Sequence, residues 1–240
     1  MTGGLPGSAV YEGADLEALS VLRNYRRWIM ARFRPFVAGD VVEIGAGIGT
    51  FSEMLAPLAR SLAIVEPSPA LSPALAARFA GTQGVDVHAA GLEDWLARAG
   101  PASADTVVMI NVLEHIEDDA AALAGLHAAL RPGGHLLLYG PALRWLYGEI
   151  DRVHGHFRRY HLDELRGRAA AAGFDVLSAR YFDFLGVLPW WLINTKGGAT
   201  AFNPRAADVY DRIGVPLTRA LETLIPPPVG KNLIAVLKRR

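Results

Sequence analysis

Short apolar runs alternate with segments of helical periodicity along most of this chain. The runs have the length and the valine, isoleucine and leucine content of buried strands. They lie at 41–45, 61–66, 85–89, 105–111, 134–139, 174–181 and 232–238. Helical spacing of apolar residues predicts an amino-terminal helix at 15–33. It also predicts helices between the strands, near 50–59, 70–79, 92–99, 117–130 and 162–172. This alternation predicts an α/β fold, in which a mostly parallel sheet has helices on both faces.

The two ends and one long connection depart from this alternation. The last two strands are separated by 182–230, which is much longer than a hairpin loop. We expect two short helices in it, at 204–213 and 216–224. The chain then forms one domain over 1–240, with a flexible tail at 1–14, a cap helix at 15–37, a core at 38–181, an acceptor-side lid insertion at 182–230 and a last strand at 231–240.

Composition argues against several classes of function. The chain has 240 residues, with 24 Lys and Arg against 24 Asp and Glu, so its formal net charge is zero. This neutral balance favours no polyanionic partner, and we expect no nucleic acid. The absence of cysteine excludes disulfides and thiol chemistry. There is no signal-peptide core and no window of 18 uninterrupted apolar residues, which predicts a cytoplasmic protein.

The first apolar run ends in a glycine-rich turn. Residues 43–50 read Glu-Ile-Gly-Ala-Gly-Ile-Gly-Thr and lead into a helix. Glycine at alternate positions lets the backbone turn sharply and approach a ligand closely, and the helix start offers free N–H groups. Glu66 ends the next strand, at the spacing where an acidic side chain accepts hydrogen bonds from ribose hydroxyls. Together these features predict a nucleotide-binding site.

The glycine spacing resembles the first motif of the class I S-adenosylmethionine (SAM) methyltransferases. A dinucleotide fingerprint has glycine at its sixth position, where this chain has Thr50. The resemblance implies a Rossmann-like seven-stranded fold in which Gly45 and Gly47 let the backbone pass against SAM. It also implies that Glu43 favours the cationic end of SAM and that Glu66 binds both ribose hydroxyls. For either glutamate the alternative is a solvated charge at a strand end.

A turn after the third strand resembles the adenine-binding turn of that family. Residues 91–95 read Gly-Leu-Glu-Asp-Trp, which implies a backbone contact at Leu92 and a side-chain contact from Glu93 or Asp94. Many members have aspartate where this chain has Gly91. The alternative is an acidic first turn that simply favours the helix dipole.

The fourth strand leads into Asn-Val-Leu-Glu-His at 111–115, which resembles a signature of ubiquinone-type and related small-molecule methyltransferases. The resemblance implies that the backbone at Asn111 and Val112 approaches the methionine part of SAM. Some relatives bind magnesium here through the Glu114–His115 pair and a further glutamate. Asn111 stands where that glutamate would be, so we expect no metal and a structural, hydrogen-bonded Glu114–His115 pair.

The amino-terminal helix carries Asn-Tyr-Arg-Arg-Trp-Ile at 24–29, which resembles a segment of one bacterial methyltransferase branch. In that branch the helix closes over SAM, which implies a bond from Tyr25 to the carboxylate of the methionine part. The alternative is that Tyr25 and Trp28 simply pack the helix on the sheet.

Residues 141–160, after the fifth strand, are dense in His, Asp, Tyr and Arg. They are expected at the carboxyl edge of the sheet, where substrates bind in such folds. Methylation of a hydroxyl group requires removal of its proton, and a histidine with a near-neutral pKa is suited to that task. Our candidate bases are His154 and His156, with Asp151 as an orienting partner. An amine acceptor would need no strong base.

The same segment resembles Tyr-Gly-x-x-Asp…Gly-His-x-Arg-Arg-Tyr of that bacterial branch. Tyr147 and Asp151 are therefore further candidates for acceptor binding. Arg158 and Arg159 either hold an acidic acceptor or pair with Asp151 and Glu149.

The insertion opens with an apolar segment at 182–194 that contains Trp190 and Trp191. The pair suits three roles: an apolar acceptor pocket lined by Trp190, a peripheral membrane contact, or burial in a lid core or homodimer contact. A lid of this size predicts a bulky or hydrophobic acceptor that is handled away from water.

Taken together, the motifs predict a SAM-dependent methyltransferase that acts on a small-molecule acceptor, most simply at a hydroxyl group. Two alternatives stay open. One is an NAD-dependent oxidoreductase, and the other is a non-catalytic SAM-binding partner protein.

Overall fold

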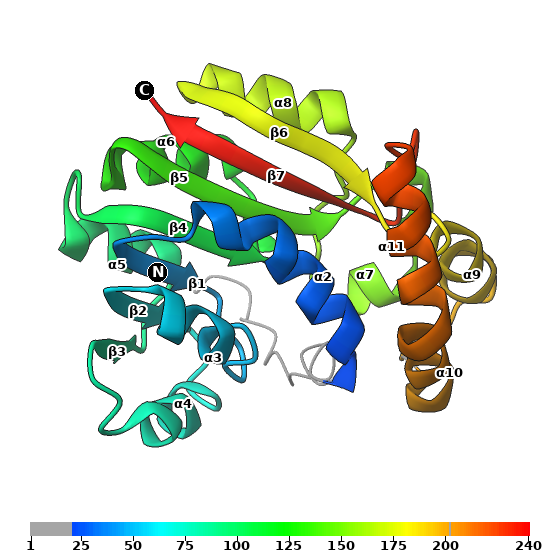
Figure 1. Ribbon diagram of the computed structural model, residues 1–240, viewed down its shortest axis with the longest axis horizontal. Helices are drawn as coiled ribbons and strands as arrows, with labels where there is room; N and C mark the ends of the chain where they lie inside the picture. The colour runs from blue at the N-terminus through cyan, green and yellow to red at the C-terminus, as the bar shows by residue number, and fades with distance from the viewer. Residues whose placement is uncertain (1–20, 202) are drawn as a thin grey trace, which may run out of the picture.

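A seven-stranded sheet forms the centre of the computed structural model, which describes residues 21–201 and 203–240 (Figure 1). The strand order is β3-β2-β1-β4-β5-β7-β6, and β7 alone runs antiparallel to its neighbours. The strands are β1 Asp40–Ile44, β2 Ser61–Val65, β3 Val85–His88, β4 Ala104–Ile110, β5 Leu130–Pro141, β6 Phe174–Phe182 and β7 Asn232–Arg239. Each overlaps a predicted strand, which confirms the α/β, Rossmann-like fold class.

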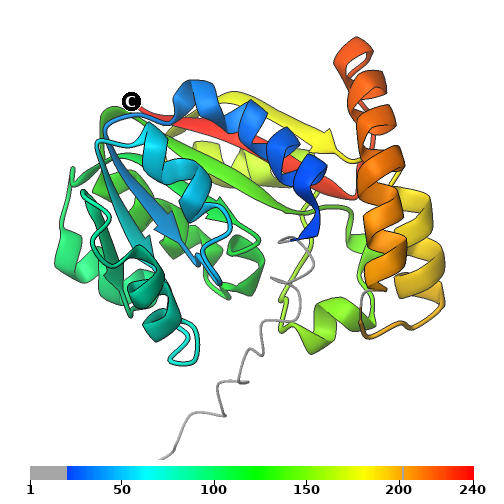
Figure 2. The same ribbon diagram turned by 60° about the horizontal axis from the view of Figure 1, so that its bottom comes forward.

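Helices cover both faces of this sheet (Figures 1 and 2). Val41 and Val108 pack into one core with residues of α2, α3 and α4, and Val42 and Val107 pack into the other with α5, α6 and α8. Strands buried on both faces read as continuous apolar runs, which explains why the sequence located them. The helices are α2 Arg23–Phe33, α3 Ser52–Leu55, α4 Ser72–Phe79, α5 Leu92–Ala99, α6 Asp119–Ala129, α7 Glu149–Val153, α8 Leu162–Ala171, α9 Val187–Trp190, α10 Pro204–Val209 and α11 Val215–Leu224.

The predicted cap helix is present as α2, which crosses one face of the sheet (Figure 1). It begins at Arg23 and buries Trp28, Ile29 and Phe33 in the core. The predicted tail at 1–14 and the predicted first part of the cap helix lie outside the described residues.

The insertion between β6 and β7 differs from the prediction. α10, a wide π-helical turn at Tyr210–Gly214 and α11 form one unbroken helix rather than two short ones (Figure 2). Gly214 keeps helical dihedrals, and the wide turn before it accommodates Pro216, which has no N–H to donate. The insertion leaves and rejoins the sheet at Phe182 and Asn232, which pair with each other.

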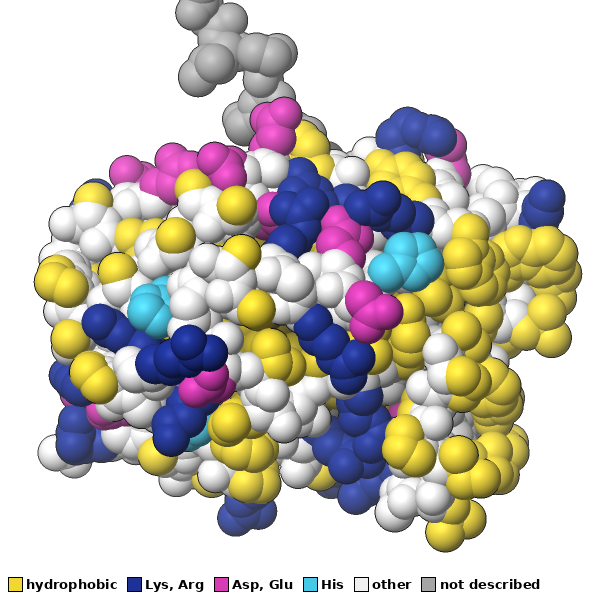
Figure 3. Space-filling model, turned by 90° about the horizontal axis from the view of Figure 1, so that it is seen from above, with side chains coloured by type: hydrophobic (Ala, Val, Ile, Leu, Met, Phe, Trp, Pro, Cys, Tyr) yellow, Lys and Arg dark blue, Asp and Glu magenta, His cyan; other side chains and the backbone are white. Residues whose placement is uncertain are grey.

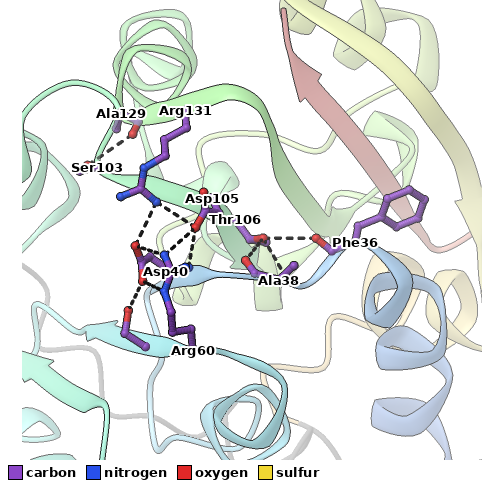
Figure 4. Close-up of polar contacts among 10 residues, drawn as sticks. Phe36, Ala38, Asp40, Arg60, Ser103, Asp105, Thr106, Ala129 and Arg131 are labelled. Carbon is purple, nitrogen blue, oxygen red and sulfur yellow. Dashed lines mark hydrogen bonds and ion pairs between the residues drawn. The ribbon is translucent and has the colours of Figure 1, made fainter.

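Charged side chains join the amino ends of neighbouring strands (Figure 4). Arg131 Nη1 lies 3.0 Å from Asp40 Oδ2 and 2.8 Å from Asp105 Oδ2, and Arg60 Nη2 lies 2.7 Å from Asp40 Oδ2. Hydrogen bonds from Arg60 hold the pKa of the Asp40 carboxyl well below its ordinary value. This network lies at the edge opposite the glycine-rich turn, so it supports strand alignment rather than a ligand site.

Candidate active site

The carboxyl ends of adjacent strands bring the predicted site residues together. β1 pairs in parallel with both β2 and β4, so that Ile44 lies opposite Val65 and Met109. The turns that follow these three strands therefore begin side by side, as in other sheets of this class. These turns begin with Gly45, Glu66 and Asn111.

Two glycines of the turn after β1 are required by its geometry. Gly45 and Gly47 have φ angles of 70° and 59°, in a region that residues with side chains rarely adopt. A Cβ atom at Gly45 would lie 2.5 Å from Cγ2 of Val112. The turn after β1 therefore contacts the turn after β4, and both present backbone at the expected SAM site.

The Glu66 carboxylate is fixed by two backbone groups. Its Oε2 accepts a hydrogen bond from the Gly47 N–H at 2.7 Å, and its Oε1 accepts one from the Ser68 N–H at 2.9 Å. Each carboxylate oxygen has a second lone pair, so the group can still accept hydrogen bonds from a ribose diol. The geometry fits the expected cofactor, and the ribose contact itself stays a prediction.

Glu43 lies within β1 and is buried, with 3% of its surface exposed. The Ser52 hydroxyl at the start of α3 donates a hydrogen bond to Glu43 Oε2, a partner that the sequence did not suggest. Burial raises the pKa of the Glu43 carboxyl to about 8, because the charged form is poorly solvated there. A cation bound nearby would favour ionisation of this group.

The predicted adenine and methionine contacts fall on turns at the same edge of the sheet. α5 begins at Leu92 after Gly91, and Glu93 is exposed in its first turn. Asn111 has a φ angle of 54°, unusual for a residue with a side chain, and its N–H donates to the Tyr139 carbonyl at 2.8 Å. The SAM contacts of Leu92, Glu93, Asn111 and Val112 stay predictions.

Tyr25 is buried in a polar network. Its hydroxyl donates to Asp183 Oδ2 at 2.9 Å and accepts from Asn232 Nδ2 at 2.7 Å. The Tyr139 hydroxyl donates to it at 2.9 Å. These contacts join α2, β5, β7 and the start of the insertion after β6. They favour the packing alternative and lend no support to a bond between Tyr25 and SAM.

Asp151 organises the acceptor-side segment. This buried carboxylate contacts His156 Nδ1 at 2.8 Å and accepts hydrogen bonds from Arg159 Nε at 2.8 Å and from the Gly148 N–H at 2.9 Å. Burial alone would raise the pKa of Asp151. The His156 hydrogen bond and the Arg159 charge outweigh burial and lower this pKa. The predicted Asp151–His156 pairing is therefore present in the structure.

Glu114 and His115 lie against this segment, a contact that sequence reasoning missed. The His115 and His156 rings meet edge to face, with 4.6 Å between their centroids. Burial raises the pKa of the Glu114 carboxyl to about 7 and lowers that of His115 to about 3. The signal was available, because Glu114 follows β4 and His156 follows β5, and these strands are neighbours.

The other predicted acceptor residues are held by protein groups. Arg158 pairs with Asp119, Nη1 to Oδ2 2.7 Å, rather than with Asp151 or Glu149. The Tyr147 hydroxyl donates to the His156 carbonyl at 2.7 Å. The half-buried His154 ring lies 6.1 Å from the His156 ring, centroid to centroid.

Trp190 connects the insertion to the acceptor-side segment. Its Nε1–H donates to the Leu146 carbonyl at 3.1 Å, and the Arg159 guanidinium lies 4.7 Å from the centre of its ring. Trp190 and Trp191 are both half-buried and pack against the core. The insertion therefore contributes an aromatic side chain next to the Asp151 cluster.

Comparisons with known proteins agree with this geometry. The family model for a methyltransferase domain matches residues 19–179. A ubiquinone biosynthesis O-methyltransferase from Xanthomonas euvesicatoria is 35% identical over 100 residues, which are 41% of this chain and 41% of the relative. The match therefore spans less than half the length of that relative.

Solved structures share the fold at low sequence identity. A SAM-dependent methyltransferase from Mesorhizobium loti is 17% identical with a TM-score of 0.63, covering 91% of this chain and 100% of the other. The phosphoethanolamine N-methyltransferase 2 of Haemonchus contortus, in complex with SAM, is 16% identical with a TM-score of 0.64, covering 98% and 61%. At these identities the similarity shows the fold alone.

Proposed function

Because this chain belongs to the methyltransferase-domain family, we propose that it is a SAM-dependent methyltransferase and that it methylates a hydroxyl group of a small-molecule acceptor. The name of the curated relative, an O-methyltransferase, supports oxygen as the methylated atom. The match covers 41% of that relative, so we do not transfer its substrate. The comparisons give no support to the oxidoreductase or to the non-catalytic partner protein.

The carboxyl edge of β1, β2 and β4 is the proposed cofactor site. When bound, SAM supplies an electrophilic methyl group on a sulfonium. Gly45 and Gly47 allow the backbone to approach its methionine and ribose portions, and Glu66 accepts from the ribose hydroxyls. The remaining proposed contacts are Glu43, Leu92, Glu93, Asn111 and Val112.

The observation that carries the hydroxyl acceptor is the Asp151–His156 contact of 2.8 Å. A carboxylate on Nδ1 favours the tautomer with its proton on that nitrogen and leaves the Nε2 lone pair to accept a proton. His156 is therefore the proposed base, ahead of His154. Since Arg158 and Arg159 are paired with Asp119 and Asp151, we propose that they shape the pocket rather than hold an acidic acceptor.

A screen of acceptors tests this proposal. The purified chain, labelled SAM and matched sets of phenols, aliphatic alcohols and amines are incubated, and methylated products are identified by mass spectrometry. We expect methyl ethers of at least one hydroxyl class. His156→Ala should lower kcat by about 10²- to 10⁴-fold with an unchanged Kd for SAM, whereas His88→Gln, at an exposed position on β3, should not. Products from amines alone, with no loss in His156→Ala, would contradict the proposal.

The apolar surface of the insertion suggests a further contact. Figure 3 shows hydrophobic side chains gathered on the side of the molecule formed by α9–α11. None of the helices within 21–201 and 203–240 is long and apolar enough to cross a bilayer. The exposed apolar residues there are Leu188, Leu192, Ile193, Val209, Ile213, Leu217, Leu221, Leu224 and Ile225.

We propose that this surface rests on an anionic membrane. Lys196, Arg205, Arg212 and Arg219 of the insertion are exposed. Arg212 pairs with the half-buried Asp208, and Asp211 and Glu222 are buried. Cations around an apolar stripe suit the interface of anionic lipids. Membrane contact through 182–194 was expected to depend on the tryptophans, but the large apolar side chains exposed there are Phe184, Leu188, Leu192 and Ile193. A homodimer contact is the other outcome of the test given below.

A further inference from the structure

Three potential metal ligands meet between the turn after β4 and the acceptor-side segment. Glu114 and His115 belong to the 3-10 turn Leu113–His115, and His156 follows α7. Each offers one donor atom, and these atoms all lie within 4.8 Å of one another. Donor atoms on a shared ion at about 2.0–2.2 Å lie at most about 4.4 Å apart, so small side-chain rotations bring the three onto one ion.

We propose that Glu114, His115 and His156 bind a divalent first-row transition-metal ion at the acceptor site. Two imidazoles and one carboxylate suit ions such as Zn²⁺ and Mn²⁺ rather than magnesium, which prefers oxygen ligands. The sequence predicted no metal because Asn111 stands where some relatives have a further glutamate. The structure provides a third donor from a different element, His156.

Glu114 gives independent support. Its side chain is 1% exposed, and neither carboxylate oxygen has a hydrogen-bond partner among the described residues. A buried carboxylate without partners is costly, and a bound cation removes that cost. Gly140 on the adjacent strand has no side chain and so leaves space for this carboxylate. A Cβ atom at Gly140 would lie only 3.2 Å from Glu114 Oε2.

His156 has the kind of outer partner that metal-bound imidazoles usually have. Asp151 Oδ1 lies 2.8 Å from His156 Nδ1, which leaves Nε2 for the ion. A carboxylate or carbonyl on the second ring nitrogen orients the ligand and increases its basicity. The cluster therefore has ligands and a supporting group in the pattern of a metal site.

This inference rests on the proposed O-methylation and changes one role within it. Three protein ligands leave positions for water or for an acceptor oxygen. An acceptor hydroxyl bound there loses its proton to water more readily. Its oxygen then bonds to the methyl carbon as the methyl–sulfur bond breaks, which leaves S-adenosylhomocysteine. In the metal-bound enzyme His156 is a ligand, and the ion takes over the activation of the hydroxyl group.

Metal binding is measured directly, without an acceptor. The full chain is treated with EDTA, dialysed and titrated with Zn²⁺ and with Mn²⁺ by calorimetry. We expect one ion per chain for at least one of the two metals. Glu114→Gln, His115→Gln and His156→Gln should each weaken that binding at least about tenfold, and Asp151→Asn should weaken it about 10- to 100-fold. His88→Gln is the matched control and should bind as the unmodified chain does.

Two further measurements keep the outcomes separable. Circular dichroism shows which variants are folded, and Co²⁺ in place of Zn²⁺ should give visible absorption bands that Glu114→Gln abolishes. Absence of binding, or equal affinity in folded Glu114→Gln and in the control, would overturn the metal site and leave O-methylation intact. Binding with the expected variant pattern, but without methyl ethers in the acceptor screen, would uphold the metal site and overturn the proposed O-methylation.

Discussion

The Asp211 carboxylate of the insertion accepts a hydrogen bond from the Tyr25 backbone N–H at 2.9 Å and so caps the first turn of α2. A second bond runs from the Asn24 N–H to the other oxygen of Asp211 at 3.0 Å. α2 has no capping side chain of its own at Leu22. The insertion therefore supplies, from the far end of the chain, groups that helices usually find next to them in sequence.

Replacement of this distant cap should destabilise the protein. We expect Asp211→Ala to lower the free energy of unfolding by about 0.5–2 kcal/mol, the range for loss of a helix cap. Urea unfolding followed by circular dichroism measures the change. Asp208→Ala removes a half-buried carboxylate from the helix that also carries Asp211. This carboxylate pairs with Arg212, and its loss should lower the free energy of unfolding by less. Equal losses in the two variants would argue against the capping role.

The ribose assignment of Glu66 can be tested by binding alone. Glu66→Ala should weaken the binding of SAM by about 1.5–3 kcal/mol, since the free energies of hydrogen bonds to a charged group fall in that range. Asp86→Ala is the control, because Asp86 is exposed on the neighbouring strand β3. Calorimetric titration with SAM gives both affinities. Unchanged affinity in Glu66→Ala would refute the ribose contact.

The buried Glu43 predicts a dependence of stability on pH. Its pKa is raised from 4.5 to about 8 in the folded chain, so the folded state holds a proton that the unfolded state releases within that window. Stability should therefore fall as pH rises from about 4.5 to 8, with a slope from this group of up to about 1.4 kcal/mol per pH unit. Glu43→Gln should remove that slope. Urea midpoints at pH 6, 7, 8 and 9 measure it, and identical profiles would exclude Glu43 as its source.

The membrane proposal predicts loss of vesicle binding when charge enters the apolar surface. Ile213→Glu combined with Leu217→Glu should abolish co-sedimentation with phosphatidylglycerol vesicles. High salt should weaken the binding of the unmodified chain to these vesicles. Leu177→Glu is the control, because Leu177 is 48% exposed on β6, outside that surface. The surface is a homodimer contact instead if the unmodified chain does not bind vesicles and is a dimer, whereas the double variant is a monomer.

The sequence predicted the sheet well because its strands are buried on both faces. Val41 and Val42 pack into opposite cores, so the run is continuous and its limits are clear. The helix over 204–224 was predicted as two pieces, because Gly214 and Pro216 are breakers in most helices. Local propensity carries no information on the wide turn that accommodates them.

The candidate site was predicted in parts. The glycine turn and Glu66 lie close in sequence and have a known spacing, so they were found. The contact of Glu114 with His156 depends on β4 and β5 being neighbours, and it was missed. Tyr25 was ambiguous because its partner, Asp183, lies in the insertion and has no local signal.

The pairing of Phe182 with Asn232 has an evolutionary consequence. The insertion starts and ends at adjacent residues of the antiparallel strands β6 and β7. It can therefore be replaced by another segment without a change in the register of the sheet. A shorter turn there would preserve β6 and β7, but α2 would lose its cap from Asp211. Recombination between relatives at these two positions would therefore keep α2 capped only when the incoming insertion carries a carboxylate where this chain has Asp211.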